Sequence, residues 1–312
     1  MNKEMMEEKY ILVTPAKNEE RNLPGLAESI LKQKLKPILW IIADDCSNDR
    51  TTEILANLSS QYLWIQVIRL NEQNKYDLGE HYAYVCRKGF KYAIDCATRN
   101  KINFEFIALS DADMLYPDDY FLKVIEFLKA NEEYGIVSGK ILIKDKEKIY
   151  EERTISIGEV YPRGTGRVWR RITFEQTNGY ILTKSPDTVS NILASIKGWK
   201  LAQVNVVCYQ TRDTGAGENL WKGYFNQGDR SYYLGANPLS LINSFVDLVF
   251  LSRQKSAFLK SIAYACGYMS SYIRKKERIE ILAVRYAIGS YSITFKHYKD
   301  FIRSIVKKLI KK

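Results

Sequence analysis

Short apolar runs alternate with stretches of helical periodicity along the chain up to residue 131. Unbroken apolar runs predict buried strands at 10–14, 38–43, 64–70 and 104–109. Apolar residues spaced three or four positions apart predict helices over 22–33, 51–58, 80–99 and 117–131. Because strands alternate with helices, we expect an α/β fold built on a mostly parallel sheet.

The alternation fades after Gly135. Residues 135–143 predict one more strand, and 161–171 form a basic segment in which four arginines stand beside Tyr161 and Trp169. From residue 240 onward the apolar spacing is helical and amphipathic. We therefore expect two regions, an α/β domain over 1–235 and a helical, basic region over 236–312.

Pairs of carboxylates follow two of the predicted strands. Asp44 and Asp45 come after the second strand, and Asp111 and Asp113 after the fourth. In open α/β sheets, ligands bind where the strands end at their carboxyl side. Two neighbouring carboxylates need positive charge, which a divalent cation carrying a phosphorylated ligand would supply. The alternative is that these aspartates lie in turns or cap the following helices.

The net charge of +11 implies an anionic partner, which is nucleotide phosphate, nucleic acid or an acidic membrane surface. The five cysteines have neither metal-ligand nor CxxC spacing, so we expect reduced thiols in an intracellular protein. Only two histidines are present, which excludes a histidine-rich zinc site. The charged start predicts no signal peptide, and no apolar run is long enough to span a membrane.

Three motifs in series resemble the family 2 glycosyltransferases with a GT-A fold. They are residues 14–20 (TPAKNEE), 44–49 (DDCSND) and 111–113 (DAD), and their order, spacing and strand context agree over about the first 140 residues. The resemblance implies a Rossmann-like, mostly parallel sheet flanked by helices, with a C-terminal helical extension. It also implies an inverting enzyme that moves a sugar from a nucleoside-diphosphate sugar to an acceptor.

The resemblance implies a role for each matching residue of the first two motifs. Pro15, Ala16 and Glu19 would line the nucleotide pocket, with Glu19 near the ribose or base. Asp45 would accept a hydrogen bond from the base, from uracil or guanine alike. For Asp44 we favour a helix-capping or turn role over contact with the ligand.

The third motif is expected to hold the diphosphate through a metal. By resemblance, Asp111 would lie near the ribose and the metal, Ala112 would line the donor pocket, and Asp113 would ligate Mn²⁺ or Mg²⁺. The physical reason is that a nucleoside-diphosphate leaving group gains negative charge as the glycosidic bond breaks, and a cation stabilises that charge.

The match weakens in the part of the chain that would bind the acceptor. The family often carries a Glu-Asp pair whose aspartate is the general base, and this chain lacks it. Asp187 is the nearest counterpart, although Pro186 and Asp187 could equally begin a helix through Ile196. Glu218 and Asp229, in a glycine-rich stretch that could form a lid, are reserve candidates.

A second departure concerns the metal and the phosphates. Many relatives have a histidine two positions before an arginine, and this chain has Gln210 at that place before Arg212. A third protein ligand for the metal is therefore in doubt. Arg212 could bind phosphate through its fork of donors, or form an ordinary ion pair.

Basic segments suggest where the acceptor and a membrane would bind. The arginines of 161–171 fit an anionic acceptor, with a solvated loop as the alternative. Residues 295–312 predict a basic amphipathic helix that lies on a membrane surface or packs on its own domain. We favour peripheral attachment to the inner, cytoplasmic face of the membrane and a lipid-linked or polysaccharide acceptor.

Two other functions compete with this one. A sugar nucleotidyltransferase would carry a glycine-rich, basic loop after the first strand, where this chain has the acidic motif 14–20. A non-enzymatic membrane- or nucleic-acid-binding protein would show strongly salt-dependent binding that does not need Asp113. For the glycosyltransferase we expect no nucleic-acid partner.

Overall fold

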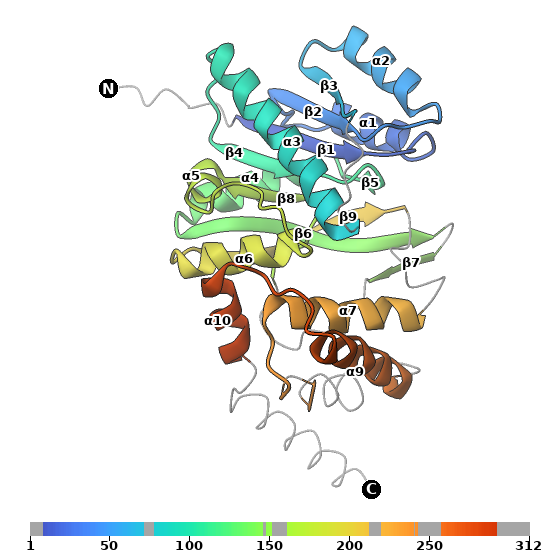
Figure 1. Cartoon of the computed structure of the whole chain (residues 1–312). Helices are drawn as coiled ribbons and strands as arrows, with labels where there is room; N and C mark the ends of the chain where they lie inside the picture. The colour runs from blue at the N-terminus through green and yellow to red at the C-terminus, as the bar shows by residue number, and fades with distance from the viewer. Residues whose placement is uncertain are drawn as a thin grey trace, which may run out of the picture. The chain divides into compact units, whose positions relative to one another are not determined.

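The computed structural model describes residues 9–71, 78–145, 148–151, 161–211, 220–239, 241–242 and 257–291 (Figure 1). The described residues up to 211 belong to one compact unit, and those from 220 onward belong to a second. The domain boundary at residue 235 expected from the sequence stays a prediction.

The first half of the first unit is a parallel α/β sheet, as the alternation predicts. Its four strands lie in the order β3-β2-β1-β4 and are all parallel. They are β1 (Tyr10–Ala16), β2 (Leu39–Asp44), β3 (Ile65–Arg69) and β4 (Phe106–Leu109). The connecting helices are α1 (Leu23–Leu31), α2 (Thr51–Gln61) and α3 (Leu78–Arg99).

The sheet continues beyond β4 with mixed directions. Within the described residues it holds nine strands, and past β4 the order is β8-β6-β9-β5, with β7 paired to β6. These strands are β5 (Met114–Leu115), β6 (Tyr134–Asp145), β7 (Lys148–Glu151), β8 (Arg167–Arg170) and β9 (Lys200–Gln210). Helices α4 (Tyr120–Ala130), α5 (Arg171–Gln176) and α6 (Pro186–Ile196) complete the unit.

The basic segment 161–171 contains an interior strand, which the sequence did not predict. β8 lies antiparallel between β4 and β6, with Val168 paired to Ala108 on one side and to Val137 on the other. Val168 and Trp169 are buried, and the burial of these two apolar side chains favours a place for the strand inside the sheet. The expectation of a basic surface loop is therefore wrong for the four residues of β8, Arg167–Arg170.

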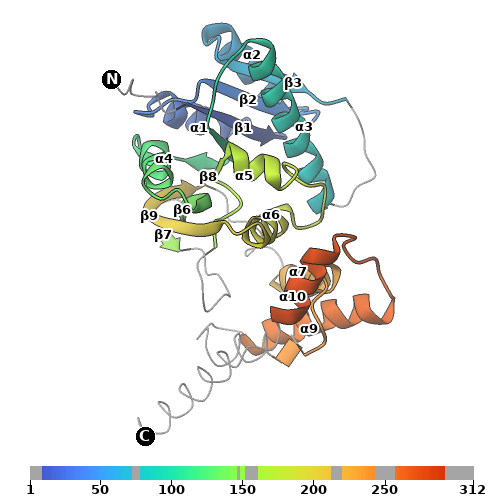
Figure 2. The ribbon, with the colours of Figure 1, turned by 90° about the vertical axis from the view of Figure 1, so that its left-hand side faces the viewer.

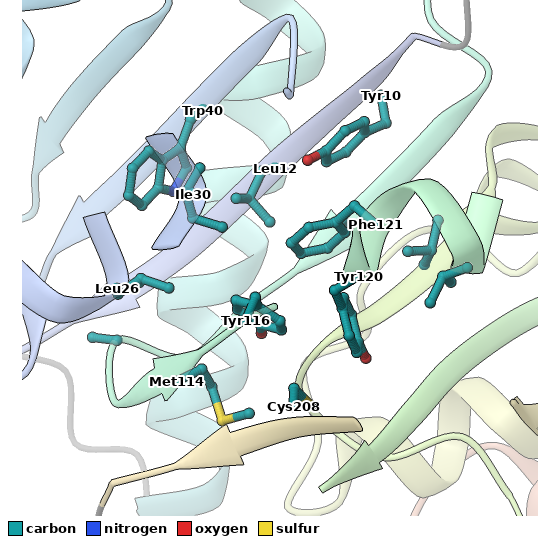
Figure 3. Close-up of a cluster of buried hydrophobic side chains, with 14 of the residues drawn as sticks. Tyr10, Leu12, Leu26, Ile30, Trp40, Met114, Tyr116, Tyr120, Phe121 and Cys208 are labelled. Carbon is teal, nitrogen blue, oxygen red and sulfur yellow. The ribbon is translucent and has the colours of Figure 1, made fainter. Parts of the chain in front are cut away.

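Both faces of β1, β2 and β4 are covered, which explains why the sequences of these three strands are mostly apolar. In β1, Tyr10 and Leu12 point into one core cluster, and the alternate residues Ile11 and Val13 point into the other. Figure 3 shows the first cluster, in which the rings of Tyr10 and Phe121 stack with centroids 5.2 Å apart.

A glycine lets α3 approach the sheet closely. A Cβ placed on Gly89 would lie 2.6 Å from Cγ1 of Val13 in β1. The contact brings the N-terminal half of α3 near the carboxyl ends of β1 and β2, where the site residues lie.

The second unit is helical, as the C-terminal apolar spacing predicts. Its described helices are α7 (Leu220–Leu234), α9 (Ala257–Ile273) and α10 (Leu282–Tyr291). Helices α7 and α9 lie side by side (Figure 1, Figure 2). A Cβ on Gly228 would overlap the carbonyl of Tyr264, and one on Gly267 would overlap the carbonyl of Phe225, so the two backbones touch.

Two expectations from the sequence concern segments that lie partly or wholly outside the described residues. The basic helix expected over 295–312 lies outside the described residues. Of the glycine-rich stretch expected to form a lid, residues 220–234 form α7 and residues 212–219 lie outside the described part. None of the described helices is long and apolar enough to cross a membrane.

Candidate active site

Three strand ends meet at one edge of the sheet in the first unit. β1 lies between β2 and β4, and all three are parallel, so their carboxyl ends are neighbours. The N–H of Asp45 donates to the carbonyl of Ala16 at 2.8 Å, which joins the ends of β2 and β1. The structure thus gathers residues 14–20, 44–49 and 110–113, which are far apart in sequence.

Asp45 is buried and held as an anion. Its Oδ2 accepts hydrogen bonds from Nζ of Lys17 at 2.9 Å and from Nε2 of His81 at 2.7 Å. Burial alone would raise the pKa of Asp45, but the hydrogen bonds and charges of Lys17 and His81 outweigh burial and lower it. Asp45 therefore presents a fixed negative acceptor at the end of β2.

The loops after β1 and β2 are tied together by polar side chains. The N–H of Asn18 donates to Oγ of Ser47 at 2.9 Å, and Oδ1 of Asn18 accepts the N–H of Asn48 at 2.9 Å. Asn18 has a positive φ of 54°, a conformation that asparagine tolerates better than most residues. These bonds give the two motifs one rigid geometry.

Glu19 is buried and organises the start of α1. Its N–H donates to Oγ1 of Thr51 at 2.7 Å, and its carboxylate accepts Nδ2 of Asn22 at 2.7 Å. Pro15 is half-buried and Ala16 is buried in the last residues of β1. All three residues expected in the nucleotide pocket therefore lie at this strand end, with Glu19 tied into the fold.

Asp44 occupies the turn that the sequence favoured for it. Its Oδ1 accepts the N–H of Ser47 at 3.0 Å, and its Oδ2 lies 3.7 Å from Nε of Arg69. The side chain is buried, so Asp44 shapes the loop that positions Asp45.

Asp111 and Asp113 lie in the turn between β4 and β5. Oδ1 of Asp111 accepts the hydroxyl of Tyr82 at 2.7 Å. The side chain of Asp113 is buried, and its Oδ2 accepts Nε2 of Gln210 at 3.1 Å. Thr211 donates to the carbonyl of Asp113 from its N–H at 2.9 Å and from its hydroxyl at 3.0 Å. Gln210, at the histidine position of many relatives, thus faces the predicted metal ligand.

The donor set at this turn fits a hard divalent cation. Within the described residues, no three His, Cys, Asp or Glu side chains gather closely enough to hold an ion by themselves. Mg²⁺ and Mn²⁺ prefer carboxylate oxygens, and Mg²⁺ usually takes one or two of them and completes its shell with phosphate and water. Asp111 and Asp113 supply such a pair, so a metal here would need the diphosphate of the ligand.

Asp187 lies in the first turn of α6, and its carboxylate contacts side chains from outside that helix. Its Oδ1 accepts the hydroxyl of Tyr180 at 3.0 Å and lies 3.4 Å from Nη1 of Arg167. A Cβ on Gly164 would overlap its Oδ2, so the backbone at Gly164 lies close to this carboxylate. Its side chain keeps 38% of its surface exposed, which leaves it open to a substrate.

Tyr82 contacts Asp111, and its pKa responds to the charges of both Asp111 and Asp187. Its hydroxyl donates to Asp111, and burial raises its pKa well above the usual value, with the charges of Asp111 and Asp187 adding to the rise. Tyr82 and Tyr180 thus each place a hydroxyl on one of the two carboxylates, Tyr82 on Asp111 and Tyr180 on Asp187.

Arg167 is fully buried and supports Asp187. It donates from Nη2 to Oδ1 of Asn191 at 2.6 Å and to the carbonyl of Pro162 at 3.1 Å, and it lies over the ring of Trp169. Burial lowers the pKa of Arg167, and the charge of Asp187 acts in the opposite direction. Arg167 therefore serves as an internal counter-ion.

Two neighbouring arginines also have structural contacts. Nε of Arg170 donates to the carbonyl of Tyr134 at 2.8 Å, and the same guanidinium bonds the carbonyl of Leu128 at the end of α4. Arg171 pairs with Glu175 at 2.7 Å. Arg167 is fully buried, so the expectation that it binds an anionic acceptor is wrong; for Arg170 and Arg171 an acceptor contact stays a prediction.

The remaining candidates lie elsewhere. Arg212 and Glu218 lie outside the described residues. Asp229 lies in α7 of the second unit, where its Oδ1 pairs with Nζ of Lys276 at 2.8 Å and accepts a hydrogen bond from Ser271. Asp229 thus joins two parts of the second unit.

A family model decides the assignment. The model of glycosyl transferase family 2 matches residues 11–192. The chain belongs to glycosyl transferase family 2. This membership favours a glycosyltransferase over a sugar nucleotidyltransferase.

Individual proteins of the family match shorter stretches. The chain is 27% identical over 128 residues to the 4,4'-diaponeurosporenoate glycosyltransferase of Staphylococcus haemolyticus, covering 41% of this chain and 30% of that protein. It is 28% identical over 161 residues to the undecaprenyl-phosphate 4-deoxy-4-formamido-L-arabinose transferase of Pectobacterium atrosepticum, covering 50% and 44%. The chain thus spans less than half the length of each of these relatives.

A solved structure supports the fold. The mannosyltransferase PcManGT from Pyrobaculum calidifontis, in complex with GDP-Man and Mn²⁺, matches with a TM-score of 0.51 at 14% identity. The match covers 97% of this chain and 87% of that one. Together with the strand order, it confirms the predicted GT-A fold.

Sequence reasoning missed several residues of the site. Lys17 stands inside the first motif, so its place in the sequence was a usable signal for a contact with Asp45. His81 and Tyr82 lie at the start of α3, outside every motif, and only the close packing of α3 on β1 brings them to the strand ends.

Proposed function

We propose that this glycosyltransferase transfers a sugar, with inversion, from a nucleoside-diphosphate sugar bound with Mn²⁺ or Mg²⁺. The observation that carries the proposal is that Asp45 follows β2 and that Asp111 and Asp113 follow β4, on either side of β1 at the ligand-binding edge of the sheet. An acceptor for the base and a carboxylate pair for a metal are thereby set at one edge.

The nucleoside would bind along the ends of β1 and β2. Asp45, kept ionised by Lys17 and His81, would accept a hydrogen bond from an imide N–H of the base. Pro15 and Ala16 would form the floor beside it, and the tied loops would fix its position. Glu19 would act through these loops, near the ribose or base.

The diphosphate would lie against the turn after β4. Asp111 and Asp113 would hold the cation there, with Ala112 between them lining the pocket. When bound, the cation supplies charge stabilisation for the departing diphosphate. Tyr82 and Gln210 would hold the two carboxylates in place through their hydrogen bonds. Arg212, by its place in the sequence, would add a contact to phosphate.

Asp187 would remove the proton from the acceptor hydroxyl. Its partial exposure gives access, and the hydroxyl of Tyr180 and the guanidinium of Arg167 orient its Oδ1. The hydroxyl would then attack the sugar carbon on the face opposite the diphosphate, which inverts the configuration there.

A lipid-linked or polysaccharide acceptor at the cytoplasmic membrane face fits the charge and the relatives. The name of one relative specifies undecaprenyl-phosphate, which is a lipid phosphate. The net charge of +11 favours an anionic membrane as the place where this chain would meet such an acceptor.

Thermal shift with UDP, GDP, CDP and dTDP, each with and without Mn²⁺, tests the donor site. We expect one nucleotide to raise the melting temperature only with Mn²⁺, because ligand that binds the folded state stabilises it. Asp113→Asn should abolish the metal-dependent shift, and the exposed Asp118→Asn on the neighbouring turn should keep it. The absence of a shift with every nucleotide would overturn the proposal.

A further inference from the structure

Helix α9 of the second unit turns large apolar side chains outward. Phe258 is 62% exposed and Ile273 is 71% exposed, although both are large and apolar. The other large apolar residues exposed on the helix are Leu259, Ile262, Met269 and Tyr272. Single exposed apolar residues are ordinary on protein surfaces, but a continuous set on one helix indicates a partner.

Five of these residues, without Tyr272, form one stripe along the helix together with Cys266. Positions 258, 259, 262, 266, 269 and 273 recur at helical spacing, so their side chains share one face. We call these six residues the outer stripe of α9. Cys266 belongs to it and is exposed as well.

The opposite face of α9 is the face that packs, and it combines small residues with the buried ring of Tyr268. Ala263 and Ser271 are buried, and Gly267 lies against the backbone of α7. Helix α9 therefore contacts α7 through the face that carries Gly267. The outer stripe lies on the other face, so it does not serve the packing of α9 on α7.

The charge around the stripe favours an anionic surface. Arg274, Lys275 and Lys276 follow the last turn of α9 directly, whereas Lys260, the one charged residue within the helix, lies over the ring of Tyr224 in α7. Across 220–239, 241–242 and 257–291, eight Lys and Arg residues stand against three Asp and Glu residues. A second copy of the chain would bring a like charge to this face, whereas anionic lipid headgroups would neutralise it.

We propose that the outer stripe of α9 lies in the headgroup region of an anionic phospholipid bilayer, with the helix parallel to the surface. An apolar face with adjacent basic residues binds membranes by burying apolar area and by attraction to anionic lipid. No described helix is long and apolar enough to cross a bilayer. The inference deepens the proposed function and rests on it for the presence of a membrane at the acceptor.

The natural cysteines provide the test. The full chain carrying Cys46→Ser is labelled with an environment-sensitive nitrobenzoxadiazole at Cys266, since Cys86, Cys96 and Cys208 are buried. Vesicles of phosphatidylcholine with phosphatidylglycerol should shift its emission to the blue, and phosphatidylcholine alone should not. The matched control carries Cys266→Ser and the label at Cys46 in the first unit, where we expect no shift.

Charged substitutions on the stripe measure its contribution. Leu259→Glu and Ile262→Glu should each lower partitioning onto the anionic vesicles by roughly tenfold or more, since each removes buried apolar area and adds repulsion. Leu63→Glu, at an apolar residue that is 91% exposed in the first unit, should leave partitioning unchanged. High salt should weaken binding of the unsubstituted chain, because it screens the basic residues.

Three outcomes would overturn the inference. One is vesicle binding that persists at full strength in both stripe variants. Another is a blue shift that appears without lipid and rises with protein concentration, together with a dimer in light scattering, which would make the stripe an interface between copies. The last is a large fall in melting temperature for Leu259→Glu, which would show that the chain covers its own stripe.

Nucleotide binding is measured on the unsubstituted, unlabelled chain without lipid. A chain that binds a nucleotide with Mn²⁺ but ignores anionic vesicles retains the proposed donor site and loses only the membrane surface. A chain that binds vesicles but no nucleotide keeps the membrane surface and loses the proposed function.

Discussion

The carboxylates at the strand ends differ mainly in the side chains that hold them. Asp45 is held by Lys17 and His81, Asp111 by a tyrosine hydroxyl, Asp113 by an amide and Asp187 by an arginine and a tyrosine. Hydrogen bonds and positive charges at a carboxylate favour its ionised form. The roles proposed for these residues therefore follow from their partners as well as from their order in the chain.

The first prediction concerns the titration of Asp45. Because its pKa in the folded protein lies below the unfolded value, it stabilises the fold above the unfolded pKa, and this stability is lost as pH falls through the folded pKa. His81→Ala removes one of the donors that lower the pKa. We expect the Asp45 pKa to rise and the midpoint of acid unfolding to move to higher pH, as followed by carboxyl NMR and circular dichroism.

Lys32→Ala is the control for this titration. Lys32 pairs with Glu28 on the exposed face of α1, where solvent screens the interaction. We expect its acid midpoint to match that of the unsubstituted chain. An unchanged Asp45 pKa in His81→Ala would show that the His81 contact does not set the charge of the site.

The second prediction concerns Asp187. Asp187→Asn keeps the size of the side chain and an oxygen for Tyr180 and Arg167 but removes the base, so kcat should fall by about 10²-fold or more. Nucleotide binding with Mn²⁺ should persist, because the donor residues are unchanged. Steady-state kinetics on a sugar-nucleotide substrate, beside thermal shift, separates the two effects.

Glu175→Gln serves as the matched control, since Glu175 is an exposed carboxylate on the nearby helix α5. A normal kcat in Asp187→Asn, together with a large loss in Asp229→Asn, would move the base to the second unit.

At the scale of elements, strands that are covered on both faces were easy to predict and β8 was not. Apart from Thr14 in β1 and Asp44 at the end of β2, the strands β1, β2 and β4 are apolar, and such an apolar run permits a buried strand. β8 carries three charged or aromatic residues in four positions, and Arg167 is buried only because Asp187 and Asn191 meet its guanidinium. Such partners come from distant segments, so a local pattern cannot reveal them.

The third prediction concerns the crossing of α7 and α9. A side chain at Gly267 would overlap a backbone carbonyl, which cannot move aside as a flexible side chain can. Gly267→Ala should therefore lower the free energy of unfolding by about 2 kcal/mol, within the usual range for overpacking. Urea unfolding followed by circular dichroism measures the change.

Ser270→Ala, at a half-exposed position on the next turn of α9, is the control and should leave the unfolding midpoint nearly unchanged. Equal midpoints for Gly267→Ala and Ser270→Ala would show that the helices do not meet at the glycine in solution.

At the scale of the whole molecule, the order of the motifs was enough to predict the GT-A fold and the edge of the sheet where the site lies. Three short motifs repeat one physical situation, a strand that ends in polar residues, and parallel strands place those ends together. The contacts of Asp45 with His81 and of Asp111 with Tyr82 depend instead on how α3 packs on β1. Packing of that kind is set by the complete core and leaves no local signature.

The fourth prediction concerns where a bound donor changes the protein. Every described residue proposed to contact the nucleotide or the metal lies in the first unit. Amide hydrogen exchange with the stabilising nucleotide and Mn²⁺ should therefore slow in 14–20, 44–49 and 110–113, while α9 and α10 exchange as before. Equal protection of α9 would contradict a donor site confined to the first unit.

The thiols of this chain have very different reactivities because of their surroundings. Burial raises the pKa of Cys208 to about 12 and that of Cys86 well above its usual value, so neither forms a thiolate at neutral pH. Cys46 in the first unit and Cys266 in the second are exposed. The natural sequence therefore offers one attachment point in each unit. The distance between two spin labels on the unsubstituted chain would report movements of the two units during turnover.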